Sequence, residues 1–418
     1  MRWLLMLALA MASICSAAQG KFVKVSPGRD FTLGDSLYRF VGTNMWYAPI
    51  LASRSEAGDS ARLQRELDRL CSLGVKNIRV LAGADAPGDA PHHVSPVLQT
   101  APGVYDSVQL EGLDRLLAEL EKRDMKAVVY LNNAWEWSGG YGSYLQWLGR
   151  GVAPVPGIDG YKEYVDHVKE FVLSPEAVQM AVEHARNIVS RTSSVTGRPY
   201  SESPAIMAWQ VCNEPRAFSR QGKEALLEYI RRVSEAVRTL DGNHLISTGS
   251  EGKYGCEVDI DLWRRIHQLP SIDYAVIHIW PFNWRWVTEP ELTSGVGEAI
   301  RSSMDYLQEH IDSLAGVHKP LVIEEFGYPR TNQSLRGGDD AAGRDVYYDA
   351  ILGLVTDGKV AGVNFWGWGG EAVPDSSRWE PGAPYVTDPA HEAQGWYSVF
   401  DSDTTTVDII RRHAQRCR

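Results

Sequence analysis

Two glutamates stand where the chain leaves a run of apolar residues. Glu214 follows such a run and precedes Pro215, which cannot donate to a sheet ladder and therefore ends a strand. Glu325 closes the run 321–325 and precedes an aromatic residue and a glycine. One protonated carboxyl and one ionised carboxylate, held about 5 to 5.5 Å apart, can break a glycosidic bond with retention of configuration. The sequence therefore predicts a two-carboxylate site, provided that the fold brings both groups together.

Glu324 is an alternative to Glu325. Adjacent residues of a strand point to opposite faces, so we expect only one of the two to face the interior. Periodicity does not choose between them. The acid and the nucleophile also need pKa values that differ, because the acid must keep its proton near neutral pH. Taken singly, either glutamate could instead form an ordinary ion pair with a nearby lysine or arginine.

Apolar runs alternate with amphipathic stretches along the chain. The runs predict strands at 38–43, 77–81, 126–132, 206–212, 244–248, 274–278, 321–325 and 362–366. Apolar residues that recur every three or four positions predict helices at 60–72, 110–123, 175–190, 223–240, 296–314 and 343–355. Eight such units indicate the α/β class and a (β/α)8 TIM barrel. The carboxyl ends of its strands would form one rim, with Glu214 on the fourth unit facing Glu325 on the seventh.

The N-terminal region carries two further features. A basic start, a short apolar run and a small-residue site over 1–18 predict a signal peptide cleaved after Ala18. A hairpin at 22–33, turning at Pro27-Gly28, should precede the first barrel strand. No linker divides the remainder, so we expect one enlarged catalytic domain over 19–418. The apolar run is too short for an anchor, so the protein should be secreted or periplasmic.

Composition and spacing argue against several kinds of partner. A net charge of −11 without basic clusters does not favour nucleic acid or an anionic membrane. No phosphate-binding glycine loop or metal-ligand spacing occurs, so we expect neither cofactor nor metal. We also expect the protein to be a monomer. A single disulfide could still form among the scattered cysteines, which are Cys71, Cys212, Cys256 and Cys417. Fourteen tryptophans, many in predicted loops, suit a neutral sugar, because indole faces can stack on pyranose rings.

The strand-end motifs, taken in order, resemble those of glycoside hydrolase family 5. They are Gly42-Thr43-Asn44, Asn77-Ile78-Arg79, Asn213-Glu214-Pro215, His278-Ile279-Trp280, Glu325-Phe326-Gly327 and Trp366. The segments 131–141 and 278–284 resemble β-mannanase loops more than cellulase loops. The resemblance therefore implies an endo-acting β-1,4-mannanase that binds β-mannan or manno-oligosaccharides.

The resemblance also implies a role for each polar residue that matches. Glu214 would be the acid/base, and Glu325, directly before the aromatic-glycine pair, the nucleophile, which decides against Glu324. Arg79 would lie under the nucleophile and keep it ionised through charge-assisted hydrogen bonds. Asn213 would donate to the 2-hydroxyl of the sugar.

The remaining matches concern one histidine and several aromatic residues. His278 would orient the catalytic groups or a sugar hydroxyl, and Trp366 would lie beneath the sugar at the cleavage point. Trp280 stands where the family most often has tyrosine, so it would form a wall without a phenolic hydrogen bond to the nucleophile. Further predicted substrate-binding residues are Trp135, Asn132 and Trp46.

Three other functions compete with this interpretation. The first is a family 5 β-1,4-glucanase, and the second a barrel that binds carbohydrate without cutting it. The third is a serine esterase, because 34–37 reads Gly-Asp-Ser-Leu around Ser36 and 388–391 supplies an Asp-x-x-His spacing ending at His391. The Gly-x-Asn-Asp block expected between those motifs is absent, and Gly34-Asp35 suits a hairpin turn.

Overall fold

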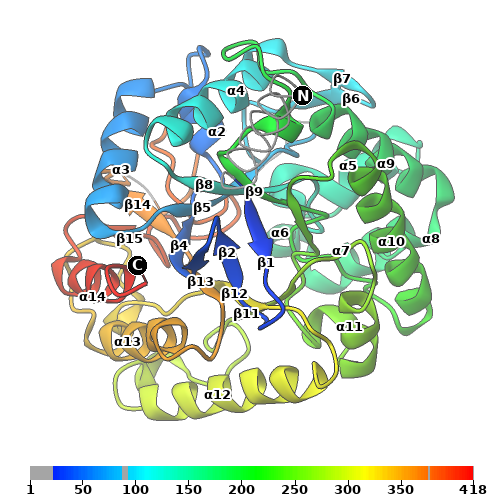
Figure 1. The fold of residues 1–418 in the computed structure, drawn as a ribbon. Coiled ribbons are helices and arrows are strands. Elements are labelled where there is room, and N and C mark those ends of the chain that lie inside the picture. Colours follow the sequence, from blue (N-terminus) through cyan, green and yellow to red (C-terminus); the bar gives the residue numbers. More distant parts are fainter. Residues whose placement is uncertain (1–21, 87–92, 375–376, 418) are drawn as a thin grey trace, which may run out of the picture.

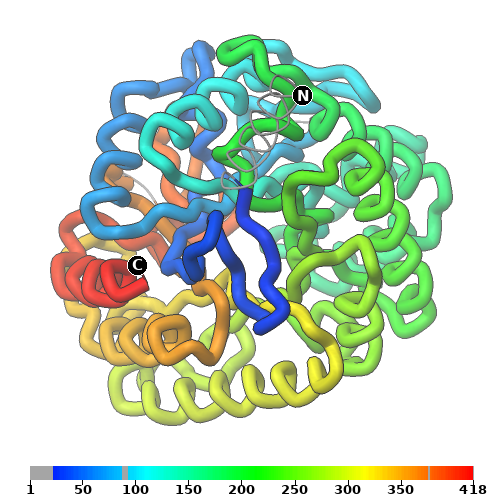
Figure 2. Tube along the Cα trace, viewed as in Figure 1, coloured from blue at the N-terminus to red at the C-terminus, as the bar shows by residue number. Residues whose placement is uncertain are grey.

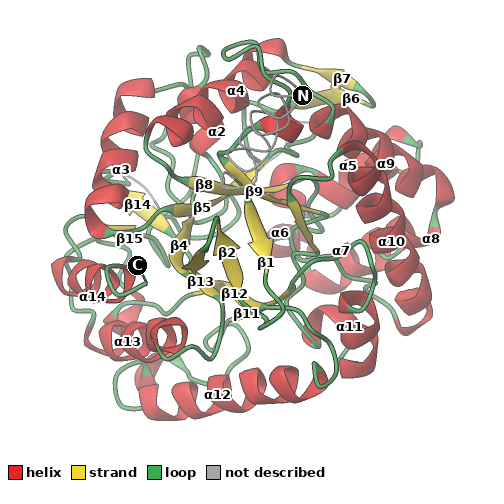
Figure 3. Ribbon diagram, in the orientation of Figure 1, coloured by secondary structure: helices red, strands yellow, loops and turns green. Residues whose placement is uncertain are grey.

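Parallel strands arranged around one axis form the centre of the molecule. The computed structural model describes residues 22–86, 93–374 and 377–417. Figure 1 shows the strands enclosed by helices, and Figure 3 shows the same arrangement as yellow strands within a ring of red helices. The strands are β4 (Phe40–Asn44), β5 (Asn77–Leu81), β8 (Lys126–Tyr130), β9 (Ile206–Gln210), β10 (Leu245–Ser247), β11 (Ala275–Ile279), β12 (Leu321–Phe326) and β13 (Gly362–Phe365). The predicted (β/α)8 barrel is confirmed.

The barrel is nearly closed. Its strands follow the order β10-β9-β8-β5-β4-β13-β12-β11, and each ladder between neighbours is parallel. The two edge strands are joined through backbone bonds, from Asp273 N–H to the Ile246 carbonyl (2.8 Å) and from His278 N–H to the Glu251 carbonyl (3.2 Å). The carboxyl ends of all these strands therefore surround one mouth.

One helix follows each barrel strand. These helices are α3 (Ser60–Leu73), α4 (Ser107–Lys122), α9 (Pro175–Val189), α10 (Lys223–Leu240), α11 (Ile260–His267), α12 (Val296–Ser313), α13 (Ala342–Thr356) and α14 (Thr404–Ala414). Asp59 caps the start of α3 by accepting from Arg62 N–H, and Gly74 ends it in a left-handed conformation. Figure 2 shows the chain passing round the barrel from blue to red, which brings α14 beside α3. The sequence analysis did not predict α11 or α14.

Short elements fill the loops beyond the strand ends. The helices are α2 (Ala48–Ala52), α5 (Gly140–Trp147), α6 (Pro156–Asp159), α7 (Tyr161–Val168) and α8 (Glu170–Leu173). The 3-10 turns are η1 (Glu136–Ser138), η2 (Tyr200–Glu202), η3 (Arg220–Gly222), η4 (Tyr254–Cys256), η5 (Glu289–Glu291) and η6 (Thr331–Gln333). β6 (Gln99–Ala101) and β7 (Val104–Tyr105) form a hairpin, whereas β14 (Trp368–Gly370) pairs in parallel with β15 (Val399–Phe400). α5, α6 and α7 extend the loop after β8 toward the mouth.

A small antiparallel sheet covers the amino end of the barrel. It consists of β1 (Val23–Val25), β2 (Phe31–Leu33) and β3 (Ser36–Tyr38), and Figure 1 shows β1 and β2 in front of the barrel axis. Its side chains Val23 and Phe31 pack on interior residues of the barrel such as Met207. The predicted hairpin is thus a three-stranded sheet, and the predicted strand at 38–43 was wrong at its start. Gly34, at φ +61°, turns the chain so that 36–38 pair with β2 instead.

Two sequence predictions can be placed only in part. The predicted signal peptide lies outside the described residues. Within those that are described, no helix has the length and apolar character needed to cross a membrane. The four cysteines at 71, 212, 256 and 417 are all unpaired, so none of them forms the disulfide that could have occurred.

Candidate active site

Glu214 and Glu325 lie together at the mouth of the barrel. Glu325 belongs to β12, and Glu214 follows β9 in a left-handed conformation at φ +49°, held by a bond from its N–H to the Gly249 carbonyl (2.9 Å). Single oxygens of the two carboxyl groups and Nδ1 of His278 all lie within 4.8 Å of one another. All three side chains are buried. The fold therefore brings together the two carboxyl groups predicted from the strand ends.

Glu324 also faces the barrel interior, so the expectation that only one of the adjacent glutamates could do so was wrong. Gln210 Nε2 and the Tyr274 hydroxyl donate to its carboxyl oxygens at 2.5 and 3.2 Å. The cause is a bulge in β12, because Ile277 pairs with Ile323 whereas the next residue of β11 pairs with Glu325. Glu324 thus lies deeper in the barrel and Glu325 lines the mouth.

Arg79 anchors the floor of the site. It is fully buried and pairs through Nη1 with Glu325 Oε1. Its Nη2 donates to Asn213 Oδ1 at 2.8 Å and its Nε donates to Gln210 Oε1, also at 2.8 Å. The guanidinium lies 4.5 Å from the ring centre of Tyr130. Arg79 therefore fixes the positions of both a carboxylate and an amide without reaching the cavity itself.

His278 bridges the two carboxyl groups. Its Nδ1 lies 2.8 Å from Glu214 Oε1 and 3.2 Å from Glu325 Oε2. Burial alone would lower the pKa of His278, but the charge of Glu325 and the hydrogen bond to Glu214 raise it to about 9. An imidazolium thus lies between Glu214 and Glu325 near neutral pH.

Trp135 holds the second oxygen of Glu214. Its indole Nε1–H donates to Glu214 Oε2 at 2.6 Å. Burial acts to raise the pKa of Glu214, but the hydrogen bond and charge of His278, the charge of Arg216 and this indole bond lower it below the ordinary value. In the free protein, the proton shared by Glu214 and His278 therefore resides on His278.

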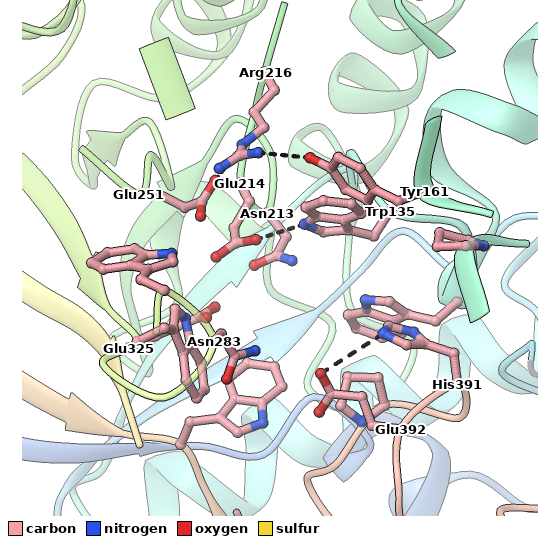
Figure 4. A pocket seen from close by; sticks show the side chains of 16 residues that line it. Trp135, Tyr161, Asn213, Glu214, Arg216, Glu251, Asn283, Glu325, His391 and Glu392 are labelled. Carbon is pink, nitrogen blue, oxygen red and sulfur yellow. Dashed lines mark hydrogen bonds and ion pairs between the residues drawn. The ribbon is translucent and has the colours of Figure 1, made fainter. Parts of the chain in front are cut away.

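A cavity of about 400 Å³ opens over the carboxyl groups. Figure 4 shows the side chains that line it. It is lined by Trp135, Trp137, Pro156, Tyr161, Asn213, Glu214, Arg216, Glu251, Trp280, Asn283, Trp284, Glu325, Trp366, Pro389, His391 and Glu392. Trp280 meets Trp366 edge-on at 6.0 Å between ring centres and meets Tyr397 at 4.9 Å. Aromatic faces and carboxyl groups line the same space, which suits a polar molecule with flat apolar faces.

Comparison with known proteins gives this cavity a context. The family model described as glycoside hydrolase family 5, β-mannosidase-like, matches residues 20–418. The chain belongs to glycoside hydrolase family 5. It is accordingly a glycoside hydrolase, and the predicted family is confirmed.

Individual members of family 5 resemble the chain over most of its length. A family 5 mannosidase from Rhizomucor miehei superposes with a TM-score of 0.86 at 30% identity, over 96% of this chain and 98% of that one. A variant of that mannosidase, with a TM-score of 0.87, was crystallised with mannosyl-fructose. The putative mannan endo-1,4-β-mannosidase 9 of Oryza sativa subsp. japonica is 28% identical over 96% of this chain and 90% of its own.

Four residues predicted to bind substrate do not line the cavity of this family 5 barrel, namely Arg79, His278, Asn132 and Trp46. Arg79 and His278 contact Glu325, whereas the other two bond elsewhere. The side chain of Asn132 accepts from Asn133 N–H (2.7 Å) and donates to the Tyr229 hydroxyl (3.3 Å). Trp46 donates to the Thr387 carbonyl at 2.7 Å and packs among other aromatic rings. Both are buried and bonded within the protein, and neither lines the cavity. Asn213 lines it, but its Nδ2 donates to Asn133 Oδ1 at 3.0 Å.

Several lining residues were absent from the sequence prediction. Arg216 directly follows the Asn-Glu-Pro motif and could have been included on that ground. Glu251 and Glu392 lie in loops and Tyr161 begins α7, and no motif marks any of the three. Burial raises the pKa of Glu251 to about 7 although Arg216 lowers it, and burial also raises the pKa of Glu392 well above its ordinary value. The loops of this family 5 member therefore add carboxyl groups that differ in environment from Glu214 and Glu325.

A cation and an esterase site can also be weighed against the geometry. Among the described residues, Glu214, His278 and Glu325 form the one group with donor atoms close enough for a metal ion. The guanidinium of Arg79 already pairs with Glu325 and would repel a second cation there.

Ser36 lies in β3 at the amino end of the barrel, whereas His391 lines the cavity at the carboxyl end. The two halves of the esterase motif therefore do not meet.

Proposed function

We propose that this protein cleaves internal β-1,4-mannosidic bonds of mannan, galactomannan or glucomannan with retention, after export from the cell. The approach of Glu214 and Glu325 within 4.8 Å is the observation that carries this proposal. Retaining glycosidases hold their carboxyl groups about 5 to 5.5 Å apart, whereas inverting ones leave about 6.5 to 9.5 Å for a water molecule. Arg79, which is protonated at every working pH, gives Glu325 a permanent cation partner and suits it to the nucleophilic role.

The proposed reaction has two steps. Glu325 attacks the anomeric carbon, the bond from that carbon to the leaving oxygen breaks, and Glu214 gives its proton to that oxygen. Water then attacks the glycosyl ester of Glu325 and loses a proton to Glu214, which frees the sugar and restores both carboxyl groups. Water is the only reactant added, because the second step returns the negative charge to Glu325 and the proton to the pair formed by Glu214 and His278.

His278 is proposed to supply the proton that Glu214 delivers. As Glu325 forms its ester, its negative charge disappears, and that charge is the strongest influence raising the pKa of His278. The proton then moves across the 2.8 Å bond from Nδ1 to Glu214 Oε1. Glu214 therefore becomes an acid at the moment when the leaving oxygen needs a proton.

Mannan as the substrate class is supported by the relatives named above. Both the Rhizomucor mannosidase and the rice relative carry mannose-directed names and match nearly the whole chain. The products formed from mannohexaose would separate the two modes of action. Early release of mannobiose and mannotriose means internal cleavage, whereas mannose alone means removal of terminal units and would overturn that part of the proposal.

The glutamate roles are tested by alanine variants. Glu214→Ala and Glu325→Ala should each lower kcat on manno-oligosaccharides by about 10² to 10⁴-fold or more while the protein stays folded. Glu163→Ala is the matched control, because this exposed glutamate of α7 does not line the cavity. Proton NMR during the first turnovers should show the β-anomer. Wild-type rates in either catalytic variant, or an α-anomer as first product, would contradict the proposal.

A further inference from the structure

Glu324 is a buried carboxyl group to which the proposed reaction gives no role. Its side chain has no exposed surface and does not line the cavity, so it does not contact a bound sugar. We propose that Glu324 is a positioning residue, which keeps Arg79 in place and balances its charge while Glu325 is an ester. The inference rests on the proposed function, because only the covalent step removes the charge of Glu325.

A side-chain route joins Glu324 to Arg79 through Gln210. Arg79 Nε donates to Gln210 Oε1 at 2.8 Å, and Gln210 Nε2 donates to Glu324 Oε2 at 2.5 Å. All three side chains are fully buried. A guanidinium only donates and a carboxylate only accepts, so the amide between them has its oxygen toward the cation and its nitrogen toward the carboxylate. Gln210 therefore connects the two charges and fixes the direction of both.

A second route passes through Asn44. Arg79 Nη1 donates to Asn44 Oδ1 at 3.1 Å, and Asn44 Nδ2 donates to the backbone carbonyl of Glu324 at 2.9 Å. The bulge in β12 turns the side chain of Glu324 into the barrel next to that of Glu325. Two adjacent residues of β12 therefore hold the same guanidinium, Glu325 directly and Glu324 through two amides.

The surroundings of Glu324 favour its ionised form. Gln210 donates to one of its oxygens and the Tyr274 hydroxyl donates to the other, at 3.2 Å. Burial raises the pKa of Glu324, and the charge of Arg79 is the largest influence that lowers it. Burial likewise would lower the pKa of Arg79, but the charges of Glu325 and Glu324 raise it. Arg79 thus has two counter-charges, and the reaction removes one of them.

The second counter-charge matters once the ester has formed. An electron pair of the Glu325 carboxylate enters the bond to the anomeric carbon, and the leaving group departs with the pair of the old bond. Glu325 thereby loses its negative charge, whereas Arg79 stays protonated. Without the charge of Glu324, the buried guanidinium would then have neither of these two carboxylates ionised, which is costly. Loss of that charge should therefore slow formation of the ester and speed its breakdown, which returns a carboxylate to Arg79.

The reagent 2-deoxy-2-fluoro-β-mannobiosyl fluoride allows the two steps to be timed separately. Its fluoride leaves without a proton, and its ring fluorine slows hydrolysis of the ester, so the adduct can be seen by intact mass spectrometry. Loss of activity gives the rate of ester formation, and recovery after removal of the reagent gives the rate of breakdown. In Glu324→Gln, formation should be about 10-fold slower and breakdown about 10-fold faster. General damage to the site would slow both.

Matched variants separate charge from shape. Glu324→Gln keeps the size of the side chain, and its amide can turn its oxygen toward Gln210 and its nitrogen toward the Tyr274 oxygen. Glu66→Gln is the control, because Glu66 is a buried carboxyl that pairs with Arg62 (3.2 Å) and does not line the cavity. It should leave both rates as in the wild type. If circular dichroism shows that Glu324→Gln is unfolded, Tyr274→Phe removes one donor to Glu324 and should shift the two rates in the same opposed directions by about threefold.

Two rates that do not move in opposite directions in the folded variant would overturn the inference. A wild-type protein that forms no adduct and loses no activity would overturn the proposed function instead. The mass of the wild-type protein therefore tells the two failures apart.

Discussion

Replacing His278 by asparagine should move the alkaline limit of activity to lower pH. Burial alone would lower the pKa of this histidine, but Glu325 and Glu214 raise it to about 9. The His278–Glu214 pair therefore keeps the proton for the leaving oxygen up to about that pH, where the macroscopic titration belongs to the pair. In the asparagine variant, only Glu214 can hold this proton.

The size of the shift can be worked out from other carboxyl groups near the cavity. Without His278, Glu214 is a buried carboxyl close to Arg216. Glu136 and Glu251 are buried carboxyls of the same region, and burial raises the pKa of each to about 7. The alkaline limb should therefore fall from about 9 to about 7, a change of ~2.7 kcal/mol in proton affinity. Between these values, the ratio of wild-type to variant activity should grow about 10-fold per pH unit.

The measurement is kcat/KM on mannotriose from pH 5 to 10. His267→Asn serves as control, because His267 is also buried but bonds to Thr248 (2.9 Å) and the Trp263 carbonyl (2.8 Å) rather than to a carboxylate. Its profile should keep the wild-type alkaline limb. An alkaline limb that stays near 9 in folded His278→Asn would show that the proton is not held on His278 and would refute the reasoning.

Two further predictions concern single bonds. Trp135→Phe removes the indole bond to Glu214 (2.6 Å), a charge-assisted bond of ~1.5 to 3 kcal/mol. Steady-state kinetics on mannotriose should therefore show kcat lower by about 10 to 100-fold. An unchanged kcat would mean that the bond is not maintained during catalysis. Asp403→Asn breaks the buried ion pair with Arg330, so urea unfolding should show a free energy of unfolding lower by ~3 to 5 kcal/mol. KM should stay within about twofold of the wild-type value. An unchanged free energy of unfolding would contradict the importance of the pair.

The barrel was predictable because its strands are covered on both faces. Each reads as an apolar run, such as β11 (Ala275–Ile279), whose residues are all buried. The two missed helices lack an equally clear pattern. α11 has only eight residues, and α14 begins with three consecutive threonines, whose β-branched side chains favour helix weakly. Length and local propensity therefore limited the prediction, while the number of strands decided the fold.

The site was predictable where a strand positions the side chain. Arg79 and His278 lie within β5 and β11, and both contact Glu325. Asn132 bonds to Asn133 and Tyr229 and shows the limit, because it lies beyond the end of β8, where strand alternation no longer fixes direction. The bulge beside Glu324 inserts one residue into β12 without a sequence signal. Tyr161 and Glu251 come from separate insertions whose meeting depends on the whole fold.

The arrangement of cations distinguishes the two glutamates more clearly than their strand-end positions do. Glu325 pairs with Arg79, whose guanidinium stays protonated at every working pH, so this carboxylate always has a cation beside it. Glu214 bonds instead to His278, which can release its proton across that bond. Exchanging the roles would place the permanent cation of Arg79 beside the acid, and would leave the nucleophile without a partner that stays charged at every working pH. The physics of the two partners therefore favours Glu325 as nucleophile and Glu214 as acid independently of the family resemblance.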